Sequence, residues 1–93
     1  FEAAGNLLAA VTGFVPGRVQ AELNWYSQER GYPLCYLTGN RLVWQLKRDL
    51  AAHRKDLSSE EQDRLFHRTY LQSGNMPLSF LRKVFVHQGL VAA

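Results

Sequence analysis

Hydrophobic residues recur at steps of three and four along nearly the whole chain, which is the spacing of one face of an α-helix. No stretch of six residues alternates convincingly between apolar and polar positions, so the sequence predicts no β-sheet. We therefore expect an all-α protein of about five helices joined by short loops.

Glycine, proline and capping residues indicate where these helices begin and end. Gly13 and Gly74 stand where a left-handed residue ends a helix, and Pro16 stands where proline is tolerated in a first turn. Ser58 and Glu61 have the spacing of a capping box. The expected helices cover residues 1–14, 16–30, 33–55, 58–72 and 77–88.

The apolar stripes of these helices predict the residues that face a core. They are Phe1, Ala4, Leu7, Leu8 and Val11; Val19, Leu23 and Tyr26; Cys35, Gly39, Leu42, Leu46 and Leu50; Leu65, Phe66, Thr69 and Tyr70; and Leu78, Leu81, Val84 and Phe85. Cys35 lies on such a stripe, and we expect it to be a small buried hydrophobe. No base that would activate its thiol is identifiable from the sequence.

The length of 93 residues fits one domain, and we expect residues 1–93 to form a single helical domain. The composition, 46% hydrophobic and 20% charged, is that of a folded chain rather than a disordered one. Apolar runs are too short to cross a membrane. Since the chain begins at Phe1 and its single methionine is Met76, we expect it to be part of a longer protein.

The net charge of +3 comes from 11 basic and 8 acidic residues, and the basic residues are scattered in pairs such as Lys47-Arg48 and Arg82-Lys83. Pairs of this kind, often beside an acid, favour a solvated helix surface over a nucleic-acid site. We expect no nucleic-acid partner. A single cysteine excludes an internal disulfide and leaves the cellular compartment open.

Spacing alone points to no catalytic centre. His53, His67 and His87 are fourteen and twenty positions apart, so none forms the His-x-x-x-His pair that places two ligands on one helix face. We assign these histidines structural roles and expect no metal site. Phosphate-binding loops, nucleophile elbows and dinucleotide fingerprints are missing as well.

Several short patterns in a fixed order resemble a known family. They are Ala21–Tyr26, Gly31–Gly39, Leu46-Lys47, Phe66-His67, Leu71 and Gly74–Leu81. Together they resemble the C-terminal end of the bacterial family called domain of unknown function eight-eight-five, over roughly Phe1 to Val86.

The resemblance implies a function that this chain would perform only as part of a larger protein. Members of the family are long helical proteins similar to zinc-dependent metallopeptidases of the gluzincin kind, whose His-Glu-x-x-His-like metal-binding helix lies upstream of this region. That helix is absent here. The resemblance therefore implies a C-terminal helical lobe that holds no cofactor itself and is inactive alone. Zinc is expected in the parent protein, and the expected partners are the rest of the parent chain and a peptide substrate.

One segment matches a feature of helical oligopeptidases, in which Gly-Tyr-x-x-x-Tyr brings a tyrosine to the scissile carbonyl. Gly31, Tyr32 and Tyr36 have this spacing. The resemblance implies that Tyr36 stabilises the oxyanion in the parent protein, with Tyr32 as a weaker candidate for substrate binding. A packed tyrosine whose hydroxyl bonds a neighbouring helix is the equally weighted alternative for Tyr36.

A second interpretation is that the whole chain is a helical module that docks a protein partner and has no catalytic activity. Trp25, Trp44, Phe80 and Phe85 would then form an exposed apolar face. Under either reading an exposed docking surface favours self-association of the chain, for instance as a dimer.

Overall fold

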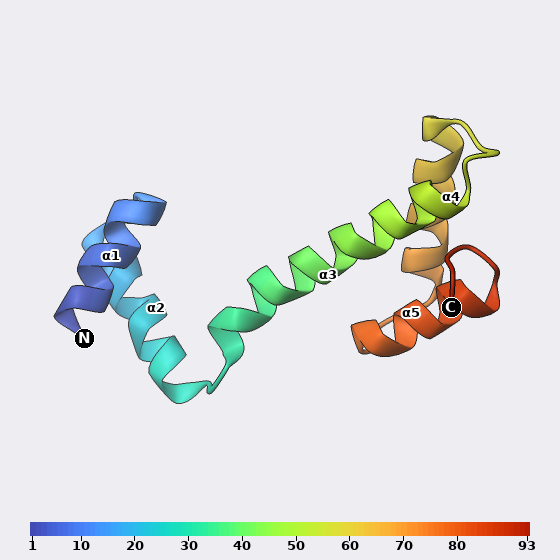
Figure 1. Ribbon diagram of the computed structural model, residues 1–93. Coiled ribbons are helices and arrows are strands. Elements are labelled where there is room, and N and C mark those ends of the chain that lie inside the picture. Colours follow the sequence, from blue (N-terminus) through green and yellow to red (C-terminus); the bar gives the residue numbers. More distant parts are fainter. The chain divides into compact units, whose positions relative to one another are not determined.

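The computed structural model describes all 93 residues as helices and loops, without a strand. The helices are α1 (Glu2–Thr12), α2 (Pro16–Gln28), α3 (Tyr32–His53), α4 (Ser59–Gln72) and α5 (Leu78–His87) (Figure 1). The predicted all-α fold of five helices is confirmed. None of the helices combines the length and the apolar character that crossing a bilayer requires.

Contacts within the chain define two compact units, unit 1 (Phe1–Leu37) and unit 2 (Thr38–Ala93). The boundary falls inside α3 rather than in a loop, next to Gly39. The expectation of a single domain stays a prediction.

The predicted helix ends are confirmed to within about two residues, because capping chemistry is local. Gly13 follows α1 with φ 72°, and its N–H donates to the Ala9 carbonyl. Ser58 accepts a hydrogen bond from the Glu61 N–H, and the Glu61 carboxylate accepts one from the Ser58 N–H at 2.8 Å. These bonds stabilise the charged form and hold the pKa of Glu61 below its ordinary value.

Unit 1 consists mainly of α1 and α2, and the two helices pack closely at Gly5 of α1. A Cβ at Gly5 would lie 3.2 Å from Leu23 Cδ1 and 3.4 Å from Val19 Cγ1. Val19 is the one buried hydrophobic residue of the unit. Unit 1 therefore has a very small core of its own.

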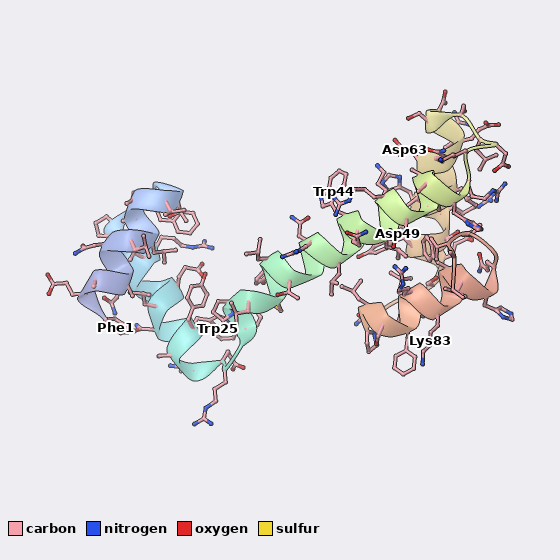
Figure 2. All side chains as sticks on the ribbon, viewed as in Figure 1. Phe1, Trp25, Trp44, Asp49, Asp63 and Lys83 are labelled. Carbon is pink, nitrogen blue, oxygen red and sulfur yellow. The ribbon has the colours of Figure 1, made fainter.

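Unit 2 holds the main core, formed between the later part of α3, α4 and α5. The buried residues in contact are Leu46, Leu50, Phe66, Leu81, Phe85, Leu90 and Val91. Two ion pairs join the helices at the rim of this core. Lys47 Nζ lies 2.9 Å from Asp63 Oδ1, and Arg82 Nη1 lies 2.6 Å from Asp49 Oδ2 (Figure 2 labels both aspartates).

The loop between α3 and α4 is held by one side chain. The amide nitrogen of Gln62 lies 2.8 Å, 3.3 Å and 3.5 Å from the backbone carbonyl oxygens of Arg54, Leu57 and Ala51, and its two N–H groups are shared among them. It thereby satisfies acceptors that the end of α3 and the loop would otherwise leave free.

The chain after α5 turns back into the core, which the sequence analysis did not predict. Gly89 has φ 69°, and the N–H of Leu90 donates to the Phe85 carbonyl at 2.9 Å while that of Gly89 donates to Val86. This is a Schellman motif, and it buries Leu90 and Val91.

Some apolar side chains that were expected to face a core are exposed. Phe1, Leu7 and Val11 are 67%, 66% and 76% exposed, and α1 has no buried residue. Cys35 is exposed rather than buried, and Leu42 is 48% exposed, because the core of unit 2 contacts α3 only along its later turns. Phe85 is fully buried against Phe66 with ring centroids 5.5 Å apart, as its apolar stripe predicts. It is therefore not part of the exposed apolar face that the docking-module interpretation expected.

Candidate functional site

The candidate site lies in unit 1, where α2 ends and α3 begins. Gly31, with φ 74°, makes the left-handed turn between the two helices. Trp25 stands in the last turn of α2, and Tyr32 and Tyr36 stand one turn apart at the start of α3 (Figure 2 labels Trp25). The short turn thus brings aromatic side chains of two helices together.

The three rings form a ladder of edge-to-face contacts. The centroids of Trp25 and Tyr32 lie 5.7 Å apart at an interplanar angle of 84°, and those of Tyr32 and Tyr36 lie 5.3 Å apart at 87°. Edge-to-face pairs of this kind are favourable because the positive ring edge meets the negative ring face. Tyr36 is nevertheless 64% exposed, so its ring is accessible from solvent.

The hydroxyls of Tyr32 and Tyr36 are hydrogen-bonded to each other. This bond, followed by desolvation, raises the pKa of Tyr36 above its ordinary value. Tyr36 is therefore protonated at neutral pH. Either hydroxyl can be the donor, and the pair as a whole keeps one O–H free to donate outward.

An ion pair on α2 faces the same space. Arg18 Nη2 lies 2.5 Å from Glu22 Oε1, and the Arg18 guanidinium carbon lies 5.2 Å from the centroid of the Phe14 ring. A hydrogen bond to Glu22, with burial as the next cause, raises the pKa of Tyr26. Glu22 is the least exposed charged group of this cluster, with a side chain 19% exposed.

These residues line a solvent-open cleft of about 630 Å³, which we call the aromatic cleft. Its lining consists of Phe14, Arg18, Ala21, Glu22, Trp25, Tyr26, Tyr32 and Tyr36. The volume lies within the range of about 300–1,000 Å³ that is typical of small-molecule sites. The structure thus places both predicted site residues, Tyr32 and Tyr36, in one concave surface.

Metal-ligating side chains do not gather anywhere in the structure. No group of three or more His, Cys, Asp or Glu residues is placed to hold a metal ion. His67 Nδ1 lies 2.7 Å from the Asp63 backbone carbonyl, one turn earlier in α4, and the ring N–H donates to it. The residues of this chain therefore do not fit a zinc ion.

Six lining residues of the cleft were not predicted as site residues, namely Phe14, Arg18, Ala21, Glu22, Trp25 and Tyr26. The available signal was the i,i+4 spacing of Arg18 and Glu22, which predicts an ion pair on one helix face. That spacing is common on exposed helices, so it does not by itself indicate a site.

Together, the helices and the cleft define an all-α protein with an aromatic cleft and no metal cluster. The model of the family described as bacterial protein of unknown function (DUF885) matches residues 1–85. The chain belongs to this family. No curated protein and no solved structure matches the chain.

Proposed function

We propose that the chain is the C-terminal helical segment of a zinc-dependent metallopeptidase-like protein and is inactive alone. The observation that carries the proposal is the exposed phenol of Tyr36 in the aromatic cleft, hydrogen-bonded to Tyr32. Family membership and the Gly-Tyr-x-x-x-Tyr spacing support it. Zinc would be held by residues outside this chain, since the chain offers no ligand cluster.

Tyr36 would act as a hydrogen-bond donor to the oxygen of the scissile carbonyl as negative charge develops there. A tyrosine phenol is protonated at neutral pH, which is the state in which it can donate. Tyr32 would orient Tyr36 through the hydrogen bond between the two hydroxyls. Removal of one such donor typically slows turnover by about 10²–10³-fold.

The test begins with the complete open reading frame that encodes this chain. We expect an upstream His-Glu-x-x-His helix, stoichiometric zinc in the purified protein and peptide hydrolysis. In that protein, Tyr36→Phe should lower kcat by about 10²–10³-fold with little change in KM, because the bond forms only in the transition state. Steady-state kinetics on a fluorogenic peptide measure both constants.

Tyr70→Phe is the matched control. This variant also removes a tyrosine hydroxyl, but in unit 2, where the Tyr70 ring stacks on Phe66 with centroids 5.8 Å apart. It should leave kcat unchanged. Full turnover in Tyr36→Phe would remove this tyrosine from the mechanism, and an open reading frame without an upstream metal-binding helix would contradict the peptidase proposal as a whole.

A helical docking module without catalytic activity is the second candidate, and it requires exposed apolar side chains, as the first candidate does. In unit 1, Leu7, Val11, Val15, Leu34 and Leu37 are each 66–76% exposed. In unit 2, Trp44 and Phe80 are 54% and 55% exposed, and Figure 2 shows Trp44 projecting from α3. Surfaces of this kind are commonly covered by another protein surface.

The occupant that we propose for these side chains is the remainder of the parent chain. Without it, the isolated chain should self-associate, and sedimentation velocity should show a dimer whose fraction rises with concentration. In the complete protein the same side chains would be covered, and this association should disappear. Dimerisation of the complete protein through these residues would favour the docking module instead.

A further inference from the structure

We propose that the aromatic cleft receives an aromatic side chain of a peptide ligand. This inference rests on the proposed function, since it names the class of peptide that the same site would take. The choice of an aromatic side chain rests on the rings and charges that line the cleft, whereas the proposed catalytic role rests on the Tyr36 hydroxyl.

The first step concerns the rings. Five of the eight lining residues are aromatic, and they come from both α2 and α3 as well as from the loop before α2. Trp25 and Tyr36 are 47% and 64% exposed, so both rings keep surface that a ligand can cover. The existing contacts are edge-to-face at 84° and 87°, and a further ring can join such a ladder through a face or an edge.

The second step concerns charge. The guanidinium of Arg18 and the carboxylate of Glu22 are paired with each other, so the lining has no net charge. A cationic ligand would have to displace Arg18 from Glu22, and an anionic ligand would have to draw Arg18 away from it. A neutral side chain enters without breaking this pair.

The third step concerns the groups that flank the side chain. The Tyr32 and Tyr36 hydroxyls lie at the same cleft and together offer one free donor and acceptor lone pairs. Peptide groups carry the complementary acceptor and donor. The cleft therefore suits an aromatic residue within a peptide better than a free hydrocarbon.

Calorimetry on the complete protein tests the inference without any need for turnover. The probes are N-acetylphenylalaninamide, N-acetylalaninamide and N-acetyllysinamide. We expect the phenylalanine amide to bind at least about tenfold more tightly than the alanine amide, because it buries a ring against other rings. Equal affinity for these two amides, or tightest binding of the lysine amide, would overturn the inference.

The two tryptophans give a matched pair of variants. Trp25→Leu should weaken binding of the phenylalanine amide about tenfold, since it removes one wall of the cleft. Trp44→Leu, in unit 2 and outside the cleft, should leave binding unchanged. Equal losses in the two variants would contradict the placement of the ligand.

Circular dichroism shows whether Trp25→Leu unfolds the protein. If it does, a variant that fills the cleft with a larger side chain still tests the inference. Ala21 is exposed and lines the cleft, so Ala21→Leu occupies ligand space without disturbing a core. It should abolish binding, and retained binding would count against the cleft.

Tyr36→Phe separates this inference from the proposed function. The variant keeps the ring and loses one hydroxyl, so the preference for the phenylalanine amide over the alanine amide should persist while turnover falls. Unchanged turnover with selective aromatic binding would reject the proposed catalytic role alone. Lost turnover without aromatic selectivity would reject the inference alone.

Discussion

At the scale of single residues, Tyr32 and Tyr36 differ in the way that a site requires. Tyr32 is half-buried and contacts Trp25 on one side and Tyr36 on the other, whereas Tyr36 is 64% exposed. The inner tyrosine therefore fixes the position of the outer one. This arrangement keeps an accessible hydroxyl in a defined place on a small helical unit.

The hydrogen bond between these tyrosines predicts a pH effect. It favours protonated Tyr36 in the folded chain, so its pKa lies above the unfolded value of 10.0. The resulting stabilisation is complete below about pH 10 and is lost as the pH rises through the folded pKa. In Tyr32→Phe the pKa of Tyr36 should fall toward its ordinary value, as measured by NMR titration of the tyrosine ring carbons.

Tyr70→Phe again serves as the control, because it removes a phenol that does not contact Tyr36. The titration of Tyr36 should be unaltered in that variant. An unaltered titration in Tyr32→Phe as well would mean that the bond between the two hydroxyls is not what raises the pKa.

At the scale of helices, the sequence predicts where each helix begins and ends. It does not predict how many turns of a helix other helices cover. Gly13, Gly74 and the Ser58–Glu61 box mark helix ends through bonds to residues a few positions away, so the sequence carries that information locally. The apolar stripe of α3 shows which face is apolar. It does not show how many turns another helix covers, and so Leu42 was misassigned.

The sequence also does not predict how residues come together in the aromatic cleft, or that the chain after α5 joins the core of unit 2. Tyr32 and Tyr36 were found through a resemblance, but their meeting with Trp25 and Glu22 depends on the turn at Gly31. Burial of Leu90 depends on the left-handed conformation at Gly89, which a glycine permits but does not require.

The capping box at the start of α4 predicts a measurable loss of stability. Ser58→Ala removes the acceptor of the Glu61 N–H and should lower the free energy of unfolding by about 1 kcal/mol. Urea unfolding followed by circular dichroism measures the change. Ser79→Ala, an exposed serine in the first turn of α5, is the matched control and should have little effect. Equal effects of the two substitutions would contradict a capping role for Ser58.

At the scale of the whole molecule, the two units differ in how much they bury. Unit 1 buries one hydrophobic residue, Val19, whereas unit 2 buries the cluster around Phe66 and Phe85. Since apolar burial is the main stabilising contribution to a fold, unit 1 depends more on additional contacts than unit 2 does.

Hydrogen exchange should show this difference directly. In the isolated chain we expect the amides of α1 and α2 to exchange faster than those of α4 and α5, because local opening is easiest where little apolar surface is buried. In the complete protein the protection of α1 and α2 should rise. Equal protection of these helices in both forms would mean that the rest of the protein does not cover unit 1.

The Gln62 side chain has a further consequence for the durability of unit 2. Its amide nitrogen faces three carbonyl oxygens from the end of α3 and the following loop. Hydrolysis of that amide over the lifetime of the protein would place a negatively charged oxygen there and turn three attractions into repulsions. Chemical ageing at this one position would therefore loosen the corner that joins α3 to α4, although no core residue had changed.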